Sequence, residues 1–384
     1  MAERPRGHVL IAGVTTRALA TSAAKSGYTV TAIDAFGDRD LRAVAHVIVA
    51  CAPPGRRYGP SQAAAAGANV PAKLVAYTSN FENYPSAVAR LAQGRQLLGN
   101  PPRVLQQVRN PVALMHTLRH HGVASPASRF TVPAEHGSMR WMLKPRRSGG
   151  GHGVRPWRPG TGLPPSMYLQ QRISGSSGSI VFASNGRHAV VLGLSRQLVG
   201  DPGLGTCGFR YCGSLLAGGD DLFHRQAELL EGATNLATVI TREFQLVGLN
   251  GIDFIARNGI AYPIEVNPRF SASMELIERG QAISMFDIHV RACRGILPSP
   301  RPPGEMVQGK AIVFARRSLT IIRSPLWESR DLADVPHQGE RIPRDQPICT
   351  VFAEAPTADA CRALLLRKAA AIYRVTDRQL RHAS

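Results

Sequence analysis

The chain has 384 residues, enough for two or three domains with buried cores. Its formal net charge is +20, but Lys and Arg are scattered along the sequence, without the basic stripe or motif typical of a nucleic-acid-binding protein. No apolar run approaches the length of a membrane span, and the short run near the N-terminus is better explained as a first β-strand than as a secretory signal. We therefore expect a cytoplasmic protein that binds an anionic small molecule or nucleotide, with nucleic acid an unlikely partner.

Residues 7–98 are predicted to form an open α/β unit. A strand (HVLIAGV), a helix (TTRALATSAAKSGY) and a second strand (TVTAIDA) follow one another. Gly13 ends the first strand, but no G-x-G-x-x-G follows, so a dinucleotide site is poorly supported. Asp34 ends the second strand, where we expect a structural or substrate-facing role.

A lysine and a glycine-rich loop follow the next helix, which is predicted over residues 111–122. Residues 140–154 read RWMLKPRRSGGGHGV, a short strand that ends near Lys144 and then a loop. A buried, unpaired ammonium is costly, and a phosphate partner would resolve that cost. Glycines allow backbone N–H groups to approach an anion closely, although they also suit an ordinary flexible loop. The lysine precedes the glycines, so this is not a Walker A loop.

Residues 166–184 are predicted as strand, turn and strand, with a break at Ser174-Gly175. Such a segment could offer backbone groups to an adenine edge, with Ile173 packing on the ring, or it could be a plain strand connection. A long helix over residues 222–243 follows from apolar residues at helical spacing.

The most informative segment is GIDFIARNGIAYPIEVNPRFSASMEL, residues 251–276, which is predicted to form a β-hairpin. Asn258-Gly259 signals the turn. A two-residue loop would place Asp253 and Glu265 on opposite faces. We therefore predict a three-residue loop with a bulge at Gly259, which gives one apolar face and places Asp253, Glu265 and Asn267 on the other. These oxygen ligands would suit a divalent metal, whereas the bland alternative is a half-buried hairpin with polar residues in solvent.

Together these segments resemble the ATP-grasp superfamily over roughly residues 70–373. The resemblance implies an α/β (α+β ATP-grasp) fold with an open α/β pre-ATP-grasp domain over 1–98, a two-lobed ATP-grasp domain over 99–297, and a small α+β C-terminal region over 298–384 that packs on the catalytic domain. It also implies ATP and Mg²⁺ (or Mn²⁺) as cofactors. The metal ligands would be Asp253, Glu265 and Asn267, and the catalytic residues Arg269 and Lys144. The nucleotide would contact Lys144, Ser148, Gly149, Gly150, Gly151, His152, Gly153, Gln170, Gln171 and Ile173.

One position departs from the pattern of this superfamily. Pro111 occupies the place of a second nucleotide-binding lysine that many members carry, and Pro cannot donate a hydrogen bond to phosphate. Arg109 lies close enough in sequence to take its place.

A narrower resemblance links the chain to the tyramine–glutamate ligase-like group of methanofuran-type, one-carbon cofactor biosynthesis. It rests on AYTSNFENYP (76–85), LLGNPP (97–102), GFRYCGS (208–214) and GERIPRDQPICTVFAEAPT (339–357). It implies a carboxylate–amine ligase that forms an acyl phosphate, with a possible homodimer. The alternatives are a non-catalytic nucleotide-binding regulatory protein of the same fold and a carboxylase-type enzyme.

Overall fold

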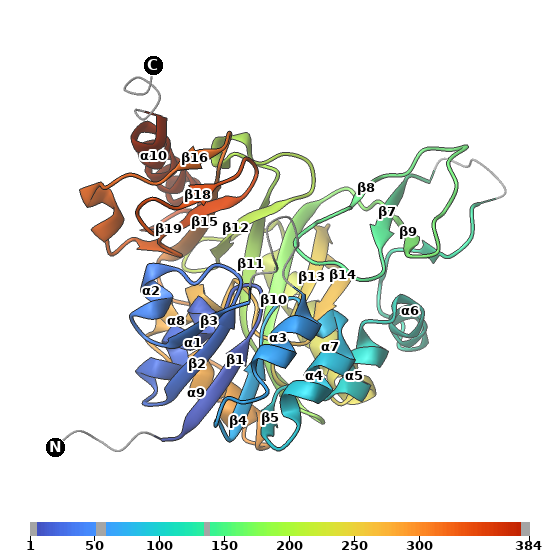
Figure 1. The fold of residues 1–384 in the computed structure, drawn as a ribbon. Coiled ribbons are helices and arrows are strands. Elements are labelled where there is room, and N and C mark those ends of the chain that lie inside the picture. Colours follow the sequence, from blue (N-terminus) through green and yellow to red (C-terminus); the bar gives the residue numbers. More distant parts are fainter. Residues whose placement is uncertain (1–5, 51–58, 134–138, 378–384) are drawn as a thin grey trace.

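The computed structural model describes residues 6–50, 59–133 and 139–377 and arranges them as two large sheets with a smaller lobe at one side (Figure 1). Within these three ranges, no helix has both the length and the apolar character needed to cross a membrane.

The N-terminal sheet contains five parallel strands in the order β3 (His46–Val49), β2 (Thr29–Asp34), β1 (His8–Ala12), β4 (Leu74–Tyr77) and β5 (Gln96–Leu98). Alternate residues of β1 point to opposite faces. Val9 and Ile11 share a core with helix α1 (Arg17–Lys25), while Leu10 shares a core with the helices on the other side. The predicted strand–helix–strand order at the start of the chain is confirmed.

Short helices complete this unit and lead into the next. They are α2 (Arg39–Arg42), α3 (Pro60–Ala66), η1 (Phe81–Asn83), α4 (Pro85–Ala92), α5 (Pro102–Val108) and α6 (Pro111–His120). Helices α3, α4, α5 and α6 all begin with proline. The N–H groups of a helix's first turn have no partner within the helix, so a proline there costs no hydrogen bond. Helix α6 ends just before Gly122, as the sequence predicted.

A four-stranded antiparallel lobe projects from the main body and lies at the right of Figure 1. Its strands occur in the order β6 (Ser128–Arg129), β9 (Met167–Gln171), β7 (Trp141–Pro145) and β8 (Arg155–Pro156). It has a small core of its own, in which Trp141, Trp157 and Leu169 are buried. The strand that carries Lys144 is therefore a confirmed prediction.

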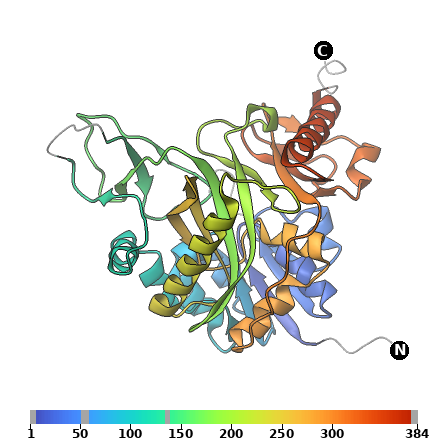
Figure 2. The same cartoon turned by 180° about the vertical axis from the view of Figure 1, so that it is seen from behind.

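The central sheet contains eight strands. Their order is β14 (Ile260–Asn267), β13 (Val247–Arg257), β10 (Ser176–Asn185), β11 (Ala189–Val199), β12 (Tyr211–Leu216), β15 (Val307–Phe314), β19 (Pro347–Ala355) and β17 (Leu332–Ala333). Ile180 and Phe182 of β10 pack on the side of helix α7 (Gln226–Phe244), which Figure 2 shows in front of the sheet. Val181 and Ala183 pack on the other side, with helix α9 (Met285–Cys293).

The C-terminal part of the chain continues this sheet. Strands β15 and β19 pair with each other and join β12, so segments from both sides of residue 298 share one hydrogen-bonded ladder. Helix α10 (Ala358–Asp377) covers them. The remaining elements are α8 (Met274–Gln281), β16 (Leu319–Thr320), β18 (Arg341–Ile342), η2 (Pro202–Leu204) and η3 (Pro325–Glu328).

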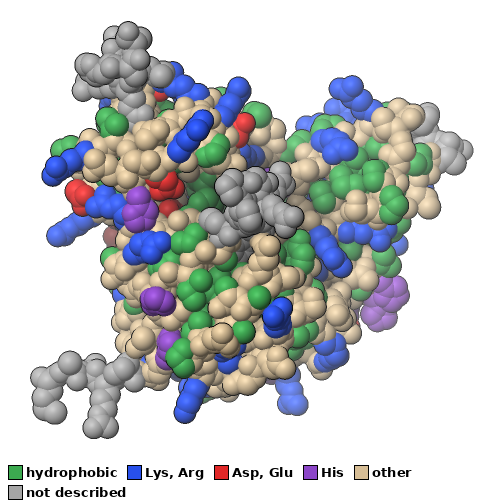
Figure 3. All heavy atoms as spheres, in the orientation of Figure 1, with side chains coloured by type: hydrophobic (Ala, Val, Ile, Leu, Met, Phe, Trp, Pro, Cys, Tyr) green, Lys and Arg blue, Asp and Glu red, His purple; other side chains and the backbone are tan. Residues whose placement is uncertain are grey.

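Helix α1 packs against helix α9, and this contact fixes the N-terminal sheet on the central one. Leu19 of α1 and Phe286 of α9 belong to one buried core. On the visible surface, Lys and Arg side chains are spread across the molecule rather than gathered in one stripe (Figure 3).

Candidate active site

The β13–β14 hairpin brings the predicted metal ligands together, but its turn differs from the prediction. Asn258 and Gly259 both have positive φ (52° and 76°), and Arg257 pairs with Ile260, as in a two-residue type I′ turn. The predicted three-residue loop is therefore wrong. The bulge lies further along β14, where the partner of Asp253 is Glu265 and the partner of Phe254 is Pro263.

Ile264 is the extra residue of this bulge, and it restores the face that the turn alone would have inverted. Pro263 has no N–H to give to the ladder, so irregular pairing is less costly there. As a result, Asp253 lies directly opposite Glu265, and Gly251 lies opposite Asn267. The predicted sharing of one face is confirmed, for a different reason.

Asp253 and Asn267 are held in a hydrogen-bond network. Asn267 Nδ2 donates to Asp253 Oδ2 at 3.0 Å, and Gln197 Nε2 from β11 donates to Asp253 Oδ1 at 2.9 Å. Gln197 was not identified from the sequence, because its contact depends on the pairing of β10 with both β11 and β13.

The two carboxylates are electrostatically unequal. Burial raises the pKa of Asp253 to about 6, and the charge of Glu265 adds to that shift. Burial acts in the same direction on Glu265, but Arg109 and Lys144 outweigh it and hold the pKa of Glu265 below its ordinary value. The ionised form of Asp253 is thus the less stabilised of the two, and a cation bound there would favour it.

Lys144 bridges the small lobe and the hairpin. Its Nζ donates to Gln170 Oε1 at 2.9 Å and to the carbonyl oxygen of Ile264, the bulged residue, at 3.0 Å. Gln170 was predicted at the adenine, and in this structure its side chain is occupied by the lysine. Gln171 accepts a hydrogen bond from the backbone N–H of Ala127 through Oε1 at 3.1 Å.

Arg109 contacts several parts of the site and lies two residues before Pro111. Its Nη1 donates to Glu265 Oε1 at 2.6 Å, and its Nη2 donates to Asn83 Oδ1 at 2.8 Å and to the Ser148 carbonyl oxygen at 2.7 Å. The guanidinium therefore connects the hairpin, the short helix η1 and the glycine loop. This places a cation two residues from Pro111, the position at which the resemblance implied a lysine.

The glycine loop depends on conformations that favour glycine. Gly150, Gly151 and Gly153 have φ of 62°, 77° and 75°. A side-chain carbon at Gly151 would lie 1.8 Å from the carbonyl oxygen of Phe209, so the loop rests directly against that backbone. Ser148 Oγ donates to the His152 carbonyl oxygen at 2.6 Å and closes the loop on itself.

Arg269 is held by a residue that the sequence did not identify. Its Nη2 pairs with Glu82 Oε1 at 2.7 Å, and it also donates to Asn267 Oδ1 at 3.1 Å. Glu82 is 1% exposed. Within the described residues, Arg269 Nε has no hydrogen-bond partner, which leaves a buried donor available. The segment 76–85 was noted for its resemblance alone; its role in holding the arginine appears only in three dimensions.

A cavity of about 700 Å³ is lined by most of the predicted site residues. They are Lys144, Ser148, Gly149, Gly150, Gly151, Gln170, Gln171, Ile173, Asp253, Glu265, Asn267 and Arg269. His152 and Gly153 do not line it, and His152 is exposed, because the loop turns the imidazole-bearing segment outward. Those two predictions are not supported by the geometry.

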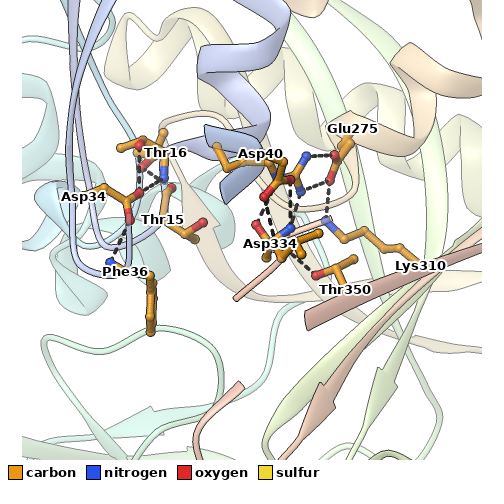
Figure 4. Close-up of polar contacts among 12 residues, drawn as sticks. Thr15, Thr16, Asp34, Phe36, Asp40, Glu275, Lys310, Asp334 and Thr350 are labelled. Carbon is orange, nitrogen blue, oxygen red and sulfur yellow. Dashed lines mark hydrogen bonds and ion pairs between the residues drawn. The ribbon is translucent and has the colours of Figure 1, made fainter. Parts of the chain in front are cut away.

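The lining of the cavity continues to Arg17, Lys310, Asp334 and Thr350, and this part of the cavity is called the second chamber below. Figure 4 shows the polar contacts around these residues. There, Arg17 pairs with Glu275 and Asp334, and Lys310 Nζ pairs with Glu275 Oε2 at 2.7 Å. Thr350 Oγ1 donates to Asp334 Oδ2 at 2.5 Å. No sequence pattern indicated this network, because its members come from five separate segments of the chain.

Asp34 is structural, one of the two roles expected for it. Its Oδ2 accepts hydrogen bonds from the backbone N–H and the hydroxyl of Thr16, each at 2.7 Å. Its Oδ1 accepts from the backbone N–H groups of Phe36 and Gly37 at 2.8 and 2.9 Å (Figure 4). These four hydrogen bonds use the acceptor sites of the carboxylate, and they hold the loops that follow β1 and β2.

Comparison with known proteins identifies the kind of domain that this chain contains. Residues 108–273 match the family model of the ATP-grasp domain. The chain therefore contains an ATP-grasp domain, and its α/β architecture is the ATP-grasp fold, as the sequence predicted. The domain boundaries proposed from the sequence, 1–98, 99–297 and 298–384, stay predictions.

Solved structures show the same fold at low sequence identity. The biotin carboxylase domain of Hydrogenobacter thermophilus 2-oxoglutarate carboxylase has a TM-score of 0.73 and 14% identity, covering 92% of this chain and 87% of that one. N5-carboxyaminoimidazole ribonucleotide synthetase from Thermus thermophilus has a TM-score of 0.67 and 17% identity, covering 96% and 98%. An L-amino acid ligase from Bacillus licheniformis has a TM-score of 0.67 and 15% identity, covering 95% and 98%.

Among curated relatives, an uncharacterized protein of Methanocaldococcus jannaschii is 29% identical over 118 residues. The match covers 30% of this chain and 28% of that protein, so the chain spans little more than a quarter of the length of this relative.

Proposed function

We propose that this protein is an ATP- and Mg²⁺-dependent carboxylate–amine ligase that works through an acyl phosphate. The observation that carries the proposal is the hairpin, on which Asp253, Glu265 and Asn267 face one cavity together with Lys144. The solved structures of the same fold include enzymes crystallised with ADP and magnesium, and one of them is an amino acid ligase. These likenesses support the proposal by analogy.

The residues present fit magnesium. Mg²⁺ is commonly bound through one or two carboxylates together with substrate phosphates. No group of three or more His, Cys, Asp or Glu in the described ranges could hold a metal by itself. Asp253, Glu265 and Asn267 would hold the ion, which when bound offsets charge on the triphosphate. Such an ion would stabilise the ionised form of Asp253, whose pKa burial and the charge of Glu265 raise.

The remaining residues would bind and orient the reactants. Lys144 would contact phosphate oxygens, and the loop of residues 148–153 would cover them with backbone N–H groups. Arg109 would keep Glu265 ionised and in place. The apolar part of the cavity, which includes Ile173 and Met142, would take the adenine.

In the proposed reaction, a substrate carboxylate oxygen attacks the γ-phosphorus of ATP, and ADP leaves. Arg269 would stabilise charge on the transferred phosphoryl group. The amine of the second substrate then attacks the acyl carbon, a proton leaves its nitrogen, and phosphate departs to give the amide. No enzyme nucleophile is needed, so the protein acts by positioning and electrostatics.

A role in one-carbon cofactor biosynthesis, a cytoplasmic location and a homodimer are further parts of the proposal. The first rests on the motif resemblance of residues 76–85, 97–102, 208–214 and 339–357 alone. A non-catalytic regulator would bind ATP without turnover, and a carboxylase would require bicarbonate, so both alternatives are outcomes of the same assay.

The test is ADP release by the purified protein with a panel of acids and amines. We expect Mg²⁺-dependent release with an acid–amine pair, and near-complete loss of turnover in Glu265→Gln, because the amide cannot supply the negative charge that the ion requires. Glu231→Gln, an identical change at an exposed helix position, should keep full activity. Retained Mg²⁺-dependent turnover in Glu265→Gln would reject the metal assignment, and release that depends on bicarbonate alone would favour a carboxylase.

A further inference from the structure

The second chamber of the cavity contains a network of charged side chains, some of whose hydrogen-bond donors and acceptors have no partner in the described structure. Four of its members line the cavity: Arg17, Lys310, Asp334 and Thr350. Glu275 and Asp40 belong to the same network but lie behind the wall, where they hold Arg17 and the backbone of the C-terminal strands. The chamber therefore presents both signs of charge to whatever binds in it.

The two carboxylates behind the wall are already paired within the protein, and neither lines the cavity. Glu275 accepts from two nitrogens of Arg17 and from Lys310, and Asp40 accepts from the backbone N–H groups of Asp334 and Val335. Burial alone would raise the pKa of Glu275, but Arg17 and Lys310 lower it far below the ordinary range, so this residue is ionised. We therefore do not expect Glu275 or Asp40 to contact a ligand directly.

Lys310 differs from them because its ammonium is buried but underused. The residue is 5% exposed, and within the described part of the chain its Nζ donates one hydrogen bond, to Glu275. An ammonium can donate three. A buried ammonium with idle donors is costly, and it is a good partner for an anionic group that enters the chamber.

Asp334 offers the complementary charge. Its Oδ1 accepts from Arg17 Nε at 2.9 Å, and its Oδ2 accepts from Thr350 at 2.5 Å and from Arg17 Nη2 at 3.4 Å. A carboxylate has about four acceptor sites, so Asp334, which lines the cavity, can accept about one further hydrogen bond. In the described structure, Lys310 and Asp334 form ion pairs with other residues and not with each other. A ligand that carries both signs of charge would satisfy both.

We propose that the second chamber binds an α-amino acid, with Lys310 contacting its carboxylate and Asp334 its ammonium group. This deepens the proposed function, on which it rests, by naming the class of one of the two substrates. A simple amine would leave the lysine donors idle, and a dicarboxylic acid without an amino group would meet Asp334 with like charge. The hydroxyl of Thr15, which also lines the cavity, can serve either group.

The test begins with the wild-type protein and needs no variant. The twenty common L-amino acids are screened by thermal shift, with and without a non-hydrolysable ATP analogue and Mg²⁺, and the best binder is titrated by calorimetry. Its decarboxylated amine and its 2-hydroxy acid counterpart are titrated in parallel. Loss of either charged group should weaken binding about tenfold or more, as expected for a charge-assisted hydrogen bond.

The variant Lys310→Met assigns the contact. It should weaken binding of the amino acid about tenfold and abolish the difference between the amino acid and its decarboxylated amine. A merely structural role for Lys310 would weaken both ligands alike. Lys25→Met is the matched control, because the side chain of Lys25 is 67% exposed and lies outside the chamber; it should change nothing.

The outcomes separate this inference from the proposed function. If the ATP analogue binds but no amino acid does, or if the analogue lacking one charge binds equally well, the inference is overturned and the ligase proposal stands. If amino acids bind and the nucleotide does not, the ligase proposal fails and the chamber assignment holds.

Discussion

Lys144 joins two segments that are 120 residues apart, the strand before the glycine loop and the bulge of the hairpin. Its partners, a side-chain oxygen and a carbonyl oxygen, are neutral, so its positive charge is available to phosphate. We predict that Lys144→Ala weakens ATP binding about tenfold or more, because a charge-assisted hydrogen bond contributes about 1.5–3 kcal/mol. Calorimetric titration checks this, with the exposed Lys73→Ala as the matched control. Unchanged affinity in the Lys144 variant would refute the assigned contact.

Glu82 is a positioning residue that acts through Arg269. The pair is buried and is made by Glu82 Oε1, while Glu82 Oε2 has no hydrogen-bond partner among the described residues. In Glu82→Gln, we expect kcat for ADP release to fall about tenfold while the KM for ATP changes little, because the arginine loses its fixed orientation and the phosphate contacts remain. A larger effect on KM than on kcat would contradict this role. The unfolding midpoint of the variant shows whether its fold is intact.

At the scale of the element, the glycine loop gives a matched pair of substitutions. Gly151 has positive φ and no room beside Phe209, whereas a side-chain carbon at Gly149 would meet nothing within 4 Å. We predict that Gly151→Ala weakens MgATP binding about tenfold or more, from about 1–3 kcal/mol of backbone strain, and that Gly149→Ala is nearly neutral. Equal KM values for ATP in the two variants would show that the resting loop conformation is not the one that binds.

The hairpin shows how far an element can be predicted. Apolar alternation predicted that Asp253, Glu265 and Asn267 share one face, and Asn258-Gly259 located the turn, but the bulge that makes both compatible was predicted at the wrong place. The register was not predictable in the same way, because the bulge at Ile264 depends on Pro263 within the strand and on Lys144 from another lobe. Local sequence predicts the two strands, but the position of the bulge is tied to the contact between Lys144 and Ile264, which are 120 residues apart.

The same limit explains the rest of the site. Lys144, Ser148 and Arg269 were identified because they belong to contiguous motifs. Glu82, Gln197 and the Arg17–Lys310 network were not, because each acts on a residue that is distant in the chain and close only after folding. His152 was placed in the phosphate loop by proximity in sequence, yet the three positive-φ glycines around it turn it to solvent.

At the scale of the whole molecule, His289 of α9 connects both large sheets. Its Nδ1 accepts from the backbone N–H of Leu249 in β13, so its Nε2 carries the proton that it donates to the Leu98 carbonyl oxygen of β5. Burial lowers the pKa of His289 from 6.5 to about 4. The unfolded chain therefore takes up this proton more readily than the folded one.

The sign of the pH effect follows. The stability that depends on neutral His289 is fully present above pH 6.5 and is lost as the pH falls toward 4, by up to about 3 kcal/mol. We predict that the free energy of unfolding in denaturant falls more steeply over this window in the wild type than in His289→Gln, which has no ionisable group. Parallel curves for the two proteins would refute the linkage.

The central claim is that the oxygens of the β13–β14 hairpin and the amine of Lys144 receive a magnesium triphosphate between them. The most direct measurement is a crystal structure with a non-hydrolysable ATP analogue and Mn²⁺, located by its anomalous signal. We predict manganese bound directly to the oxygens of Asp253, Glu265 and Asn267, with the nucleotide phosphates in contact with Lys144. Manganese away from these oxygens, or a nucleotide bound outside the cavity, would contradict the account.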